Sequence, residues 1–88
     1  IDVFFVAPGD LAQTMGYVGD WARSEVQDVV SDTLKRIVDA GRIAGSLNSP
    51  DTLQEHIDIG VKFHHMYYDA WIREGAAKYL GDVDAMIP

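Results

Sequence analysis

The stretch Phe4–Gly16, FFVAPGDLAQTMG, decides both the fold class and the candidate site of this chain. It closes an apolar run that starts at Ile1, and such a run is typical of a strand buried on both faces, as in a parallel sheet. The run ends abruptly in Pro8-Gly9-Asp10. A carboxylate beside a glycine, just past a strand, is how α/β proteins hold a ligand at a strand's C-terminal end. We therefore predict a strand over Ile1–Val6 followed by a ligand site.

Composition limits the function classes. The 88 residues suit one small domain, and an apolar share of 48% excludes a disordered chain. Fourteen acidic side chains against seven basic ones give a net charge of −7, which argues against nucleic acid or a membrane surface as a partner. A small anionic substrate stays possible, because a bound metal ion can reverse the local field. We expect a cytoplasmic protein.

Two further features bear on the chain's context. There is no cysteine, so disulfides and thiolate metal sites are excluded. The chain begins with Ile1, inside a strand-like run, and not with methionine. From this we expect a truncated sequence whose preceding part has been lost.

The strongest predicted helix runs from Ser24 to about Gly41. Ser24 and Gln27 fit a capping box at its start, and Gly41 suits a left-handed end. Its apolar residues recur at helical spacing: Val26, Val29, Val30, Leu34, Ile37 and Val38.

Strands and helices alternate along the rest of the chain. The pattern predicts a strand over Arg42–Leu47, a helix from Ser49 to Gly60, a strand over Val61–Met66 and a helix from Asp69 to Leu80. After Gly81 no pattern is evident. Alternation of this kind predicts an α/β fold with parallel strands, whose three units are too few to close a barrel.

The first stretch also resembles a known family. Ala7-Pro8-Gly9-Asp10-Leu11-Ala12, with Met15-Gly16 following, is similar to a motif of the HpcH/HpaI aldolase and citrate lyase family, the metal-dependent class II 2-oxo acid aldolases. The similarity continues through Ala40-Gly41-Arg42-Ile43-Ala44-Gly45 to about Gly60 and is weak afterwards.

The resemblance implies a fold and a set of site residues. Members are TIM (β/α)₈ barrels, and residues 1–88 would be the C-terminal portion, about strands six to eight with their helices, of a single barrel domain. Asp10 would be a metal ligand, and Gly9, Asp10 and Leu47 would bind substrate. No catalytic residue would lie within this chain, because the family's second carboxylate ligand (a Glu) and its His and Arg come earlier in the sequence.

The implied activity is cleavage of a 4-hydroxy-2-oxo acid to pyruvate and an aldehyde. A hard divalent cation such as Mg²⁺, Mn²⁺ or Co²⁺ stabilises the pyruvate enolate as a Lewis acid, and it prefers oxygen ligands such as an aspartate. The implied partners are a small 2-oxo acid, the remainder of the barrel, and further copies in a homo-oligomer. The isolated chain should be inactive.

Other roles stay open for the residues of interest. Asp10 could be a helix cap, with Pro8-Gly9 a plain turn. His64 and His65 are neighbours on a strand and should point to opposite faces, so they should not share a metal ion. Tyr67 and Tyr68, at the end of the last strand, should narrow a pocket there.

Three more side chains are predicted to be structural. We expect His56 on a helix surface, and Trp21 and Trp71 in packing or subunit contacts. Two other functions also fit the sequence: a non-catalytic barrel remnant, or a small acidic protein-interaction module in which Pro8-Gly9-Asp10 is only a turn.

Overall fold

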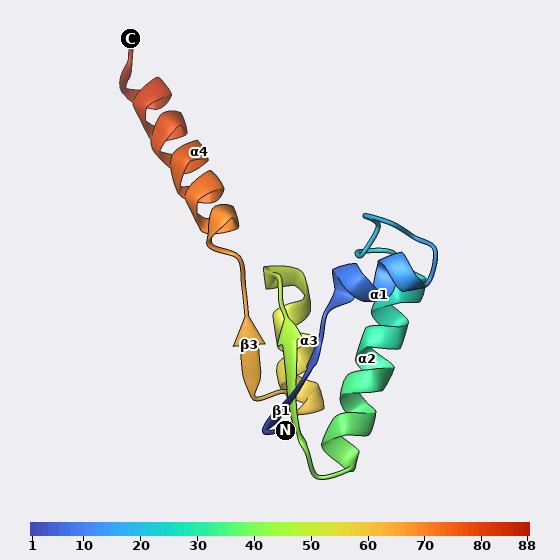
Figure 1. Cartoon of the computed structure of the whole chain (residues 1–88). Helices are drawn as coiled ribbons and strands as arrows, with labels where there is room; N and C mark the ends of the chain where they lie inside the picture. The colour runs from blue at the N-terminus through green and yellow to red at the C-terminus, as the bar shows by residue number, and fades with distance from the viewer.

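The computed structural model describes all 88 residues and confirms the alternation of strands and helices. The strands are β1 (Val3–Val6), β2 (Ile43–Leu47) and β3 (Phe63–His65). The helices are α1 (Pro8–Thr14), α2 (Ser24–Asp39), α3 (Pro50–Ile59) and α4 (Tyr68–Met86). Each strand is therefore followed by at least one helix (Figure 1).

The three strands form one parallel sheet in the order β1-β2-β3, as predicted. Phe5 pairs with Gly45, and Gly45 pairs with Phe63 on the other side. Because all strands run the same way, their C-terminal ends meet at one edge of the sheet. Leu47 and His65 lie opposite each other at that edge.

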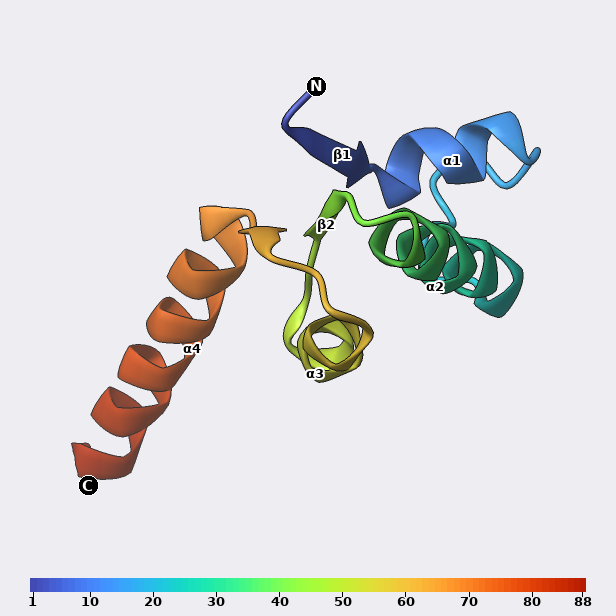
Figure 2. The same cartoon turned by 90° about the horizontal axis from the view of Figure 1, so that it is seen from below.

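One face of the sheet is covered by helices. Figure 2 shows α2 and α3 on the same side, and α2 contacts β1, β2 and α3. On this face Ala44 and Ser46 are fully buried. The hydrophobic core lies between sheet and helices: Ala12, Val26, Val30, Leu34, Ala44 and Val61.

The opposite face of the sheet is open. Phe5 and Phe63 stand on it with 42% and 51% of their surface exposed, and their rings meet edge to face at a centroid distance of 6.3 Å. Gly45 lies between them, and a Cβ added there would come within 3.2 Å of both rings. We refer to the side chains of Phe5, Ile43, Phe63 and His65 on this face as the open-face residues.

The start of α2 differs from the predicted capping box. Its N-cap is Arg23, without a side-chain cap, and Ser24 is already the first helical residue. The Ser24 hydroxyl donates to the Glu25 carboxylate at 3.3 Å, and Gln27 Nε2 donates to the Trp21 carbonyl at 2.7 Å. Both side chains thus have other partners. The predicted end is confirmed, since Gly41 takes a φ of +75°.

The α3 boundaries agree with the sequence. Ser49 is the N-cap of a capping box with Thr52, Pro50 occupies the first turn, and Gly60 ends the helix with a φ of +107°. The Ser49 N–H donates to Thr52 Oγ1 at 3.0 Å, which fixes the turn between β2 and α3.

The last helix begins earlier and ends later than predicted. Tyr67 is its N-cap, while Asp69 lies in the first turn and pairs with Arg73 at 2.7 Å. The helix continues through Gly81 to Met86, so the prediction that it stops near Leu80 is wrong. It has no buried residue and points away from the sheet (Figure 1).

None of the helices combines the length and the apolar character that crossing a bilayer would require.

Candidate functional site

A cavity of about 490 Å³ lies at the edge where the strands end. Three separate segments line it, and each follows one strand: residues 7–10 after β1, residues 47–50 after β2, and residues 65–67 at the end of β3. Asp10, Leu47 and the segment from Tyr67 to Asp69 thus lie toward one end of the sheet. The edge of the parallel sheet is where these residues meet.

Asp10 borders this cavity from the first turn of α1. The helix is capped by Ala7, without a side-chain bond, and Pro8 occupies its first position. Asp10 is therefore not the N-cap, and the alternative of a capping aspartate is wrong. Its backbone carbonyl accepts from the Thr14 hydroxyl at 3.1 Å, whereas its carboxylate has no hydrogen-bond partner in the chain. The carboxylate is exposed and available to a ligand.

Gly9 and Leu47 line the same cavity. The space over the Gly9 Cα is open, with no atom within 4 Å of an added Cβ, so a ligand can approach the backbone beside Asp10. Leu47 is the last residue of β2 and is half-buried, opposite His65. The structure thus brings the three residues around one space.

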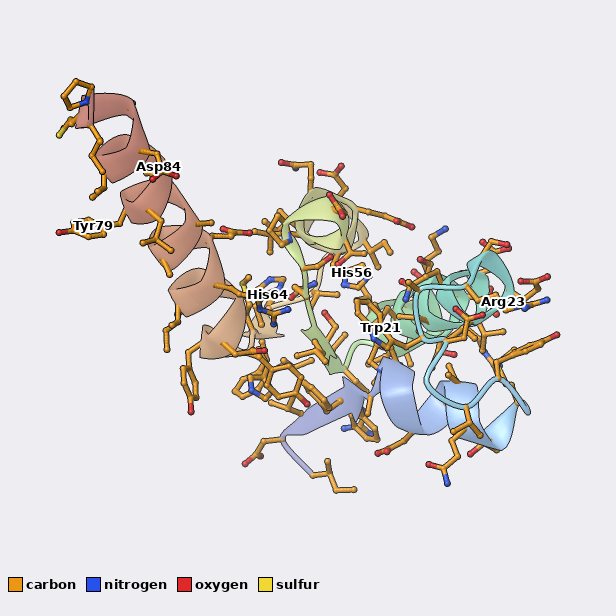
Figure 3. The ribbon with its side chains drawn as sticks, turned by 90° about the horizontal axis from the view of Figure 1, so that it is seen from above. Trp21, Arg23, His56, His64, Tyr79 and Asp84 are labelled. Carbon is orange, nitrogen blue, oxygen red and sulfur yellow. The ribbon has the colours of Figure 1, made fainter.

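The loop between α1 and α2 supplies a further wall, through Trp21. Gln27 of α2 holds this loop through its bond to the Trp21 carbonyl. Arg23 also fixes it, with its guanidinium 4.2 Å from the centre of the Tyr17 ring and 3.0 Å from the Glu25 carboxylate. Trp21 and Arg23 are labelled on this loop in Figure 3. The prediction that Trp21 serves in packing or subunit contacts did not include its place at the cavity.

The β3–α4 segment brings aromatic rings to the cavity. His65 packs against Phe5 and Tyr67, with ring centroids 6.1 Å and 5.3 Å apart. Tyr67 therefore stands at the pocket, as predicted, while Tyr68 does not line it. Arg73 is the only cationic side chain on the cavity, and its partner there is Asp69.

Behind the cavity lies a polar cluster of Ser46, Asn48, His56 and His64. His56 Nδ1 is 2.9 Å from Ser46 Oγ and 2.6 Å from Asn48 Nδ2. On the other side of the amide, Asn48 Oδ1 is 2.7 Å from His64 Nδ1. Figure 3 shows His56 on α3 and His64 on β3. Of the four, only Asn48 also lines the cavity.

The prediction that His56 lies on a helix surface is wrong, because the side chain is only 1% exposed. Burial lowers the pKa of His56, the charge on Glu55 opposes this, and His64 adds to the lowering. His56 Nε2 is buried without any hydrogen-bond partner. His64 and His65 point to opposite faces as predicted: His64 bonds Asn48 and His65 packs on Phe5.

The residues present fit a divalent metal only in part. Asp10 offers an unpaired carboxylate, the hard oxygen donor that Mg²⁺ or Mn²⁺ prefers. No group of three or more His, Cys, Asp or Glu side chains in this chain could hold an ion together. A metal at Asp10 would therefore need further ligands from outside these residues.

Curated relatives of the chain are aldolases. It is 36% identical over 64 residues to a hydroxypyruvate/pyruvate aldolase of Roseobacter denitrificans, which is 72% of this chain and 25% of that enzyme. It is 38% identical over 64 residues to a 2-keto-3-deoxy-L-rhamnonate aldolase of Shigella dysenteriae, covering 72% of this chain and 24% of the enzyme. No model of a protein family matches the chain.

The fold also matches a solved structure. A HpcH/HpaI aldolase/citrate lyase family protein from Burkholderia cenocepacia superimposes with a TM-score of 0.80 at 22% identity, over 96% of this chain and 34% of that one. The chain thus spans about a quarter to a third of the length of the proteins it matches. The resemblance to this family is confirmed, as is the α/β fold of part of a (β/α)₈ barrel.

Sequence reasoning missed several cavity residues. Asn48 and Ser49 follow a strand end as Asp10 does, so the same positional rule would have found them. Trp21, Gln27 and Arg73 come from a loop and from helices, and no local spacing connects them to the strand ends.

Proposed function

We propose that this chain forms one wall of the active site of an aldolase that cleaves a 4-hydroxy-2-oxo acid to pyruvate and an aldehyde. Residues 1–88 are then the C-terminal portion of a single (β/α)₈ barrel domain. One observation carries the proposal: Gly9, Asp10 and Leu47, chosen from the sequence, border one cavity at the C-terminal edge of a parallel sheet. The similarity to aldolases supports it.

Asp10 is the proposed metal ligand, for Mg²⁺, Mn²⁺ or Co²⁺. Its carboxylate is exposed at the cavity and has no competing partner. Such an ion, when bound, acts as a Lewis acid on the oxo and carboxylate oxygens of the substrate. Gly9 leaves open space beside Asp10 for the substrate, and Leu47 offers an apolar contact for the methyl end of pyruvate.

The reaction breaks the bond between C3 and C4 of the substrate. A base takes the proton of the C4 hydroxyl, the aldehyde leaves, and the electron pair of the broken bond forms the pyruvate enolate. A proton added at C3 then gives pyruvate. The resemblance assigns the base and the second carboxylate ligand to residues outside this chain, so the 88 residues alone should release no pyruvate even with excess metal.

The open-face residues support a larger barrel. Phe5, Ile43 and Phe63 are apolar, each more than 40% exposed, and stand together on one face of the sheet. In a closed barrel this face is the filled interior. The remaining strands are therefore the partner we propose for it, and the exposed apolar side chains of α4 are the surface for contacts in a homo-oligomer.

Replacing Asp10 with Asn in the full-length protein tests the site. The change removes one negative charge from the ligand set while keeping the side-chain shape. We expect metal affinity to fall at least about tenfold, the loss that even an outer partner of a metal ligand causes. Titration calorimetry measures the affinity, and the melting temperature should barely change because the carboxylate holds no bond in the fold.

Asp51→Asn is the matched control. Asp51 also lies in the first turn of a helix, α3, but outside the cavity, so its change should leave metal affinity intact. If Asp10→Asn binds metal as tightly as the unaltered protein, Asp10 is not a ligand. A non-catalytic barrel remnant or an acidic interaction module then becomes the better account.

A further inference from the structure

The cluster of Ser46, Asn48, His56 and His64 allows only certain proton positions. A carbonyl oxygen can only accept, so His64 Nε2, 3.0 Å from the Val61 carbonyl, carries a proton. The other ring nitrogen, Nδ1, faces the Asn48 amide group at 2.7 Å. Whether Nδ1 carries a proton therefore depends on which end of that amide it meets.

In a first arrangement, Asn48 turns Oδ1 toward His64. Nδ1 of His64 must then donate, so both its nitrogens are protonated and the ring is a cation. The amide nitrogen of Asn48 points at His56 Nδ1, 2.6 Å away, and donates to it. Nδ1 of His56 is consequently bare, and the proton of this neutral ring sits on Nε2, the buried atom without a partner.

In a second arrangement, the Asn48 amide is turned over. Its nitrogen donates to a bare Nδ1 of His64, which is now neutral, and Oδ1 faces His56. An oxygen at 2.6 Å requires a donor, so the His56 proton moves to Nδ1 and leaves Nε2 bare. The Asn48 atom 3.3 Å from Ser46 Oγ also changes, from the accepting Oδ1 to the donating Nδ2. The Ser46 hydroxyl can donate to the first and accept from the second.

We propose that Asn48 couples the charge of His64 to the tautomer of His56, giving the β2–α3 turn beside the cavity two hydrogen-bonding states selected by pH. His64 is exposed and exchanges protons with solvent, whereas His56 is buried. Asn48 is itself buried, and its backbone N–H donates to the His65 carbonyl at 2.8 Å. The backbone at Asn48 is therefore fixed, and its side-chain amide exchanges the positions of Oδ1 and Nδ2 by turning over.

The surrounding groups are few. From α3, Glu55 is the charged neighbour of His56, and Ser31 of α2 donates to the Glu55 carboxylate at 2.7 Å. From β2 only the neutral Ser46 and Asn48 take part, and Lys62 is the one further charge next to His64 on its own strand segment. Burial keeps His56 neutral, because it lowers the pKa of that ring. The exposed His64 is thus the member that takes up the proton.

Imidazole ¹⁵N NMR of the full-length protein, with its histidines assigned, tests this between about pH 5 and 8. These residues contain three histidines, and His65, outside the cluster, is an internal reference. We expect His56 Nδ1 to change from bare to protonated as pH rises, with the same midpoint as the loss of the His64 charge. His65 should show no such tautomer change. A single His56 tautomer across the His64 titration would overturn the proposal.

Asn48→Ala isolates the role of the amide. It should abolish the tautomer change at His56 while His64 still titrates, and persistence of that change would also overturn the proposal. Gln54→Ala is the control: Gln54 is an exposed residue of α3, the helix that carries His56, and its side chain bonds only Asp58, so this variant should keep the coupling. If Asn48→Ala does not fold, the titration of the unaltered protein decides alone. No activity is measured, so the result is independent of the proposed aldolase function.

Discussion

The two faces of the sheet differ in what completes them. On the helix-covered face, Ala44 and Ser46 are fully buried by segments of this chain. On the other face, Phe5 and Phe63 are 42% and 51% exposed. The helices of this chain therefore suffice to bury the first face, whereas the second face carries large apolar side chains that no layer of this chain covers. The cavity lies at the border of the two, where the strands end.

The largest expected effect is on the open face. Phe63→Ala in the full-length protein should lower the free energy of unfolding by about 3–5 kcal/mol, because a barrel interior would bury the ring completely. In the 88-residue chain the same change should cost much less, since the ring is already half exposed. Denaturant unfolding of both proteins measures the difference.

Leu34→Ala is the control from the covered face. Leu34 is fully buried within this chain, so its loss should cost about 2–5 kcal/mol wherever it is measured. A small and equal cost of Phe63→Ala in both proteins would show that nothing covers the open face, and it would contradict the barrel proposal.

A smaller effect is expected at Gly45, on the same face. An added Cβ would lie 2.9 Å from Val3 Cγ1, 3.1 Å from Phe5 and 3.2 Å from Phe63, so these side chains must move. We expect Gly45→Ala to cost about 1–3 kcal/mol in the full-length protein, the usual penalty of overpacking. Thermal unfolding measures it.

Gly75→Ala is the matched comparison in α4. Its Cβ would meet nothing within 4 Å, and the residue is inside a helix. Alanine there should instead stabilise by about 0.5–1 kcal/mol. Stabilisation at both positions would mean that the rings over Gly45 move without cost.

The smallest expected effect is the pH dependence from His56, on the covered face. Its pKa is lowered in the fold, so the unfolded chain binds the proton more readily. Stability is then complete above the ordinary histidine value of about 6.5, falls as the pH drops below it, and levels off below the folded pKa. His56→Gln should remove this slope, as urea unfolding at several pH values will show.

His65→Gln provides the reference from the open face. His65 packs beside Phe5 without joining the buried cluster, so the slope should persist in this variant. If the slope is lost in the His65 variant and kept in the His56 variant, the pH dependence comes from the open face and the prediction for His56 is wrong.

Much of this architecture was predictable from the sequence. The apolar run before Pro8, the stripe of α2 and the Ser49-Pro50 start of α3 are local signals, and the structure confirms the strand and both helices. The expected burial of that strand on both faces is wrong in this chain, because Phe4 and Phe5 are 36% and 42% exposed. Parallel strands end together, and the resemblance to the barrel family assigned Asp10 and Leu47 to such strand ends, where both border one cavity. The assigned roles of Gly9, Asp10 and Leu47 stay predictions.

The errors came where a side chain has a distant or competing partner. His56 is buried because Ser46 and Asn48, ten and eight residues earlier, satisfy its ring, which the helical spacing around it cannot reveal. The capping box at Ser24 failed because Gln27 reaches the Trp21 carbonyl. The helix α4 continues through Gly81 with exposed ion pairs such as Lys78–Asp82, although no apolar pattern is evident in the sequence after Gly81.

The order β1-β2-β3 makes β1 and β3 the two outer strands, and each leaves one row of backbone N–H and C=O groups unpaired. Unpaired rows of this kind recruit strands from other molecules. The outer strand VFFV has no charge or proline to prevent such recruitment. Made alone, this segment should self-associate into aggregates through β1, opposed only by its net charge of −7. In the proposed barrel, neighbouring strands would pair with both unpaired rows.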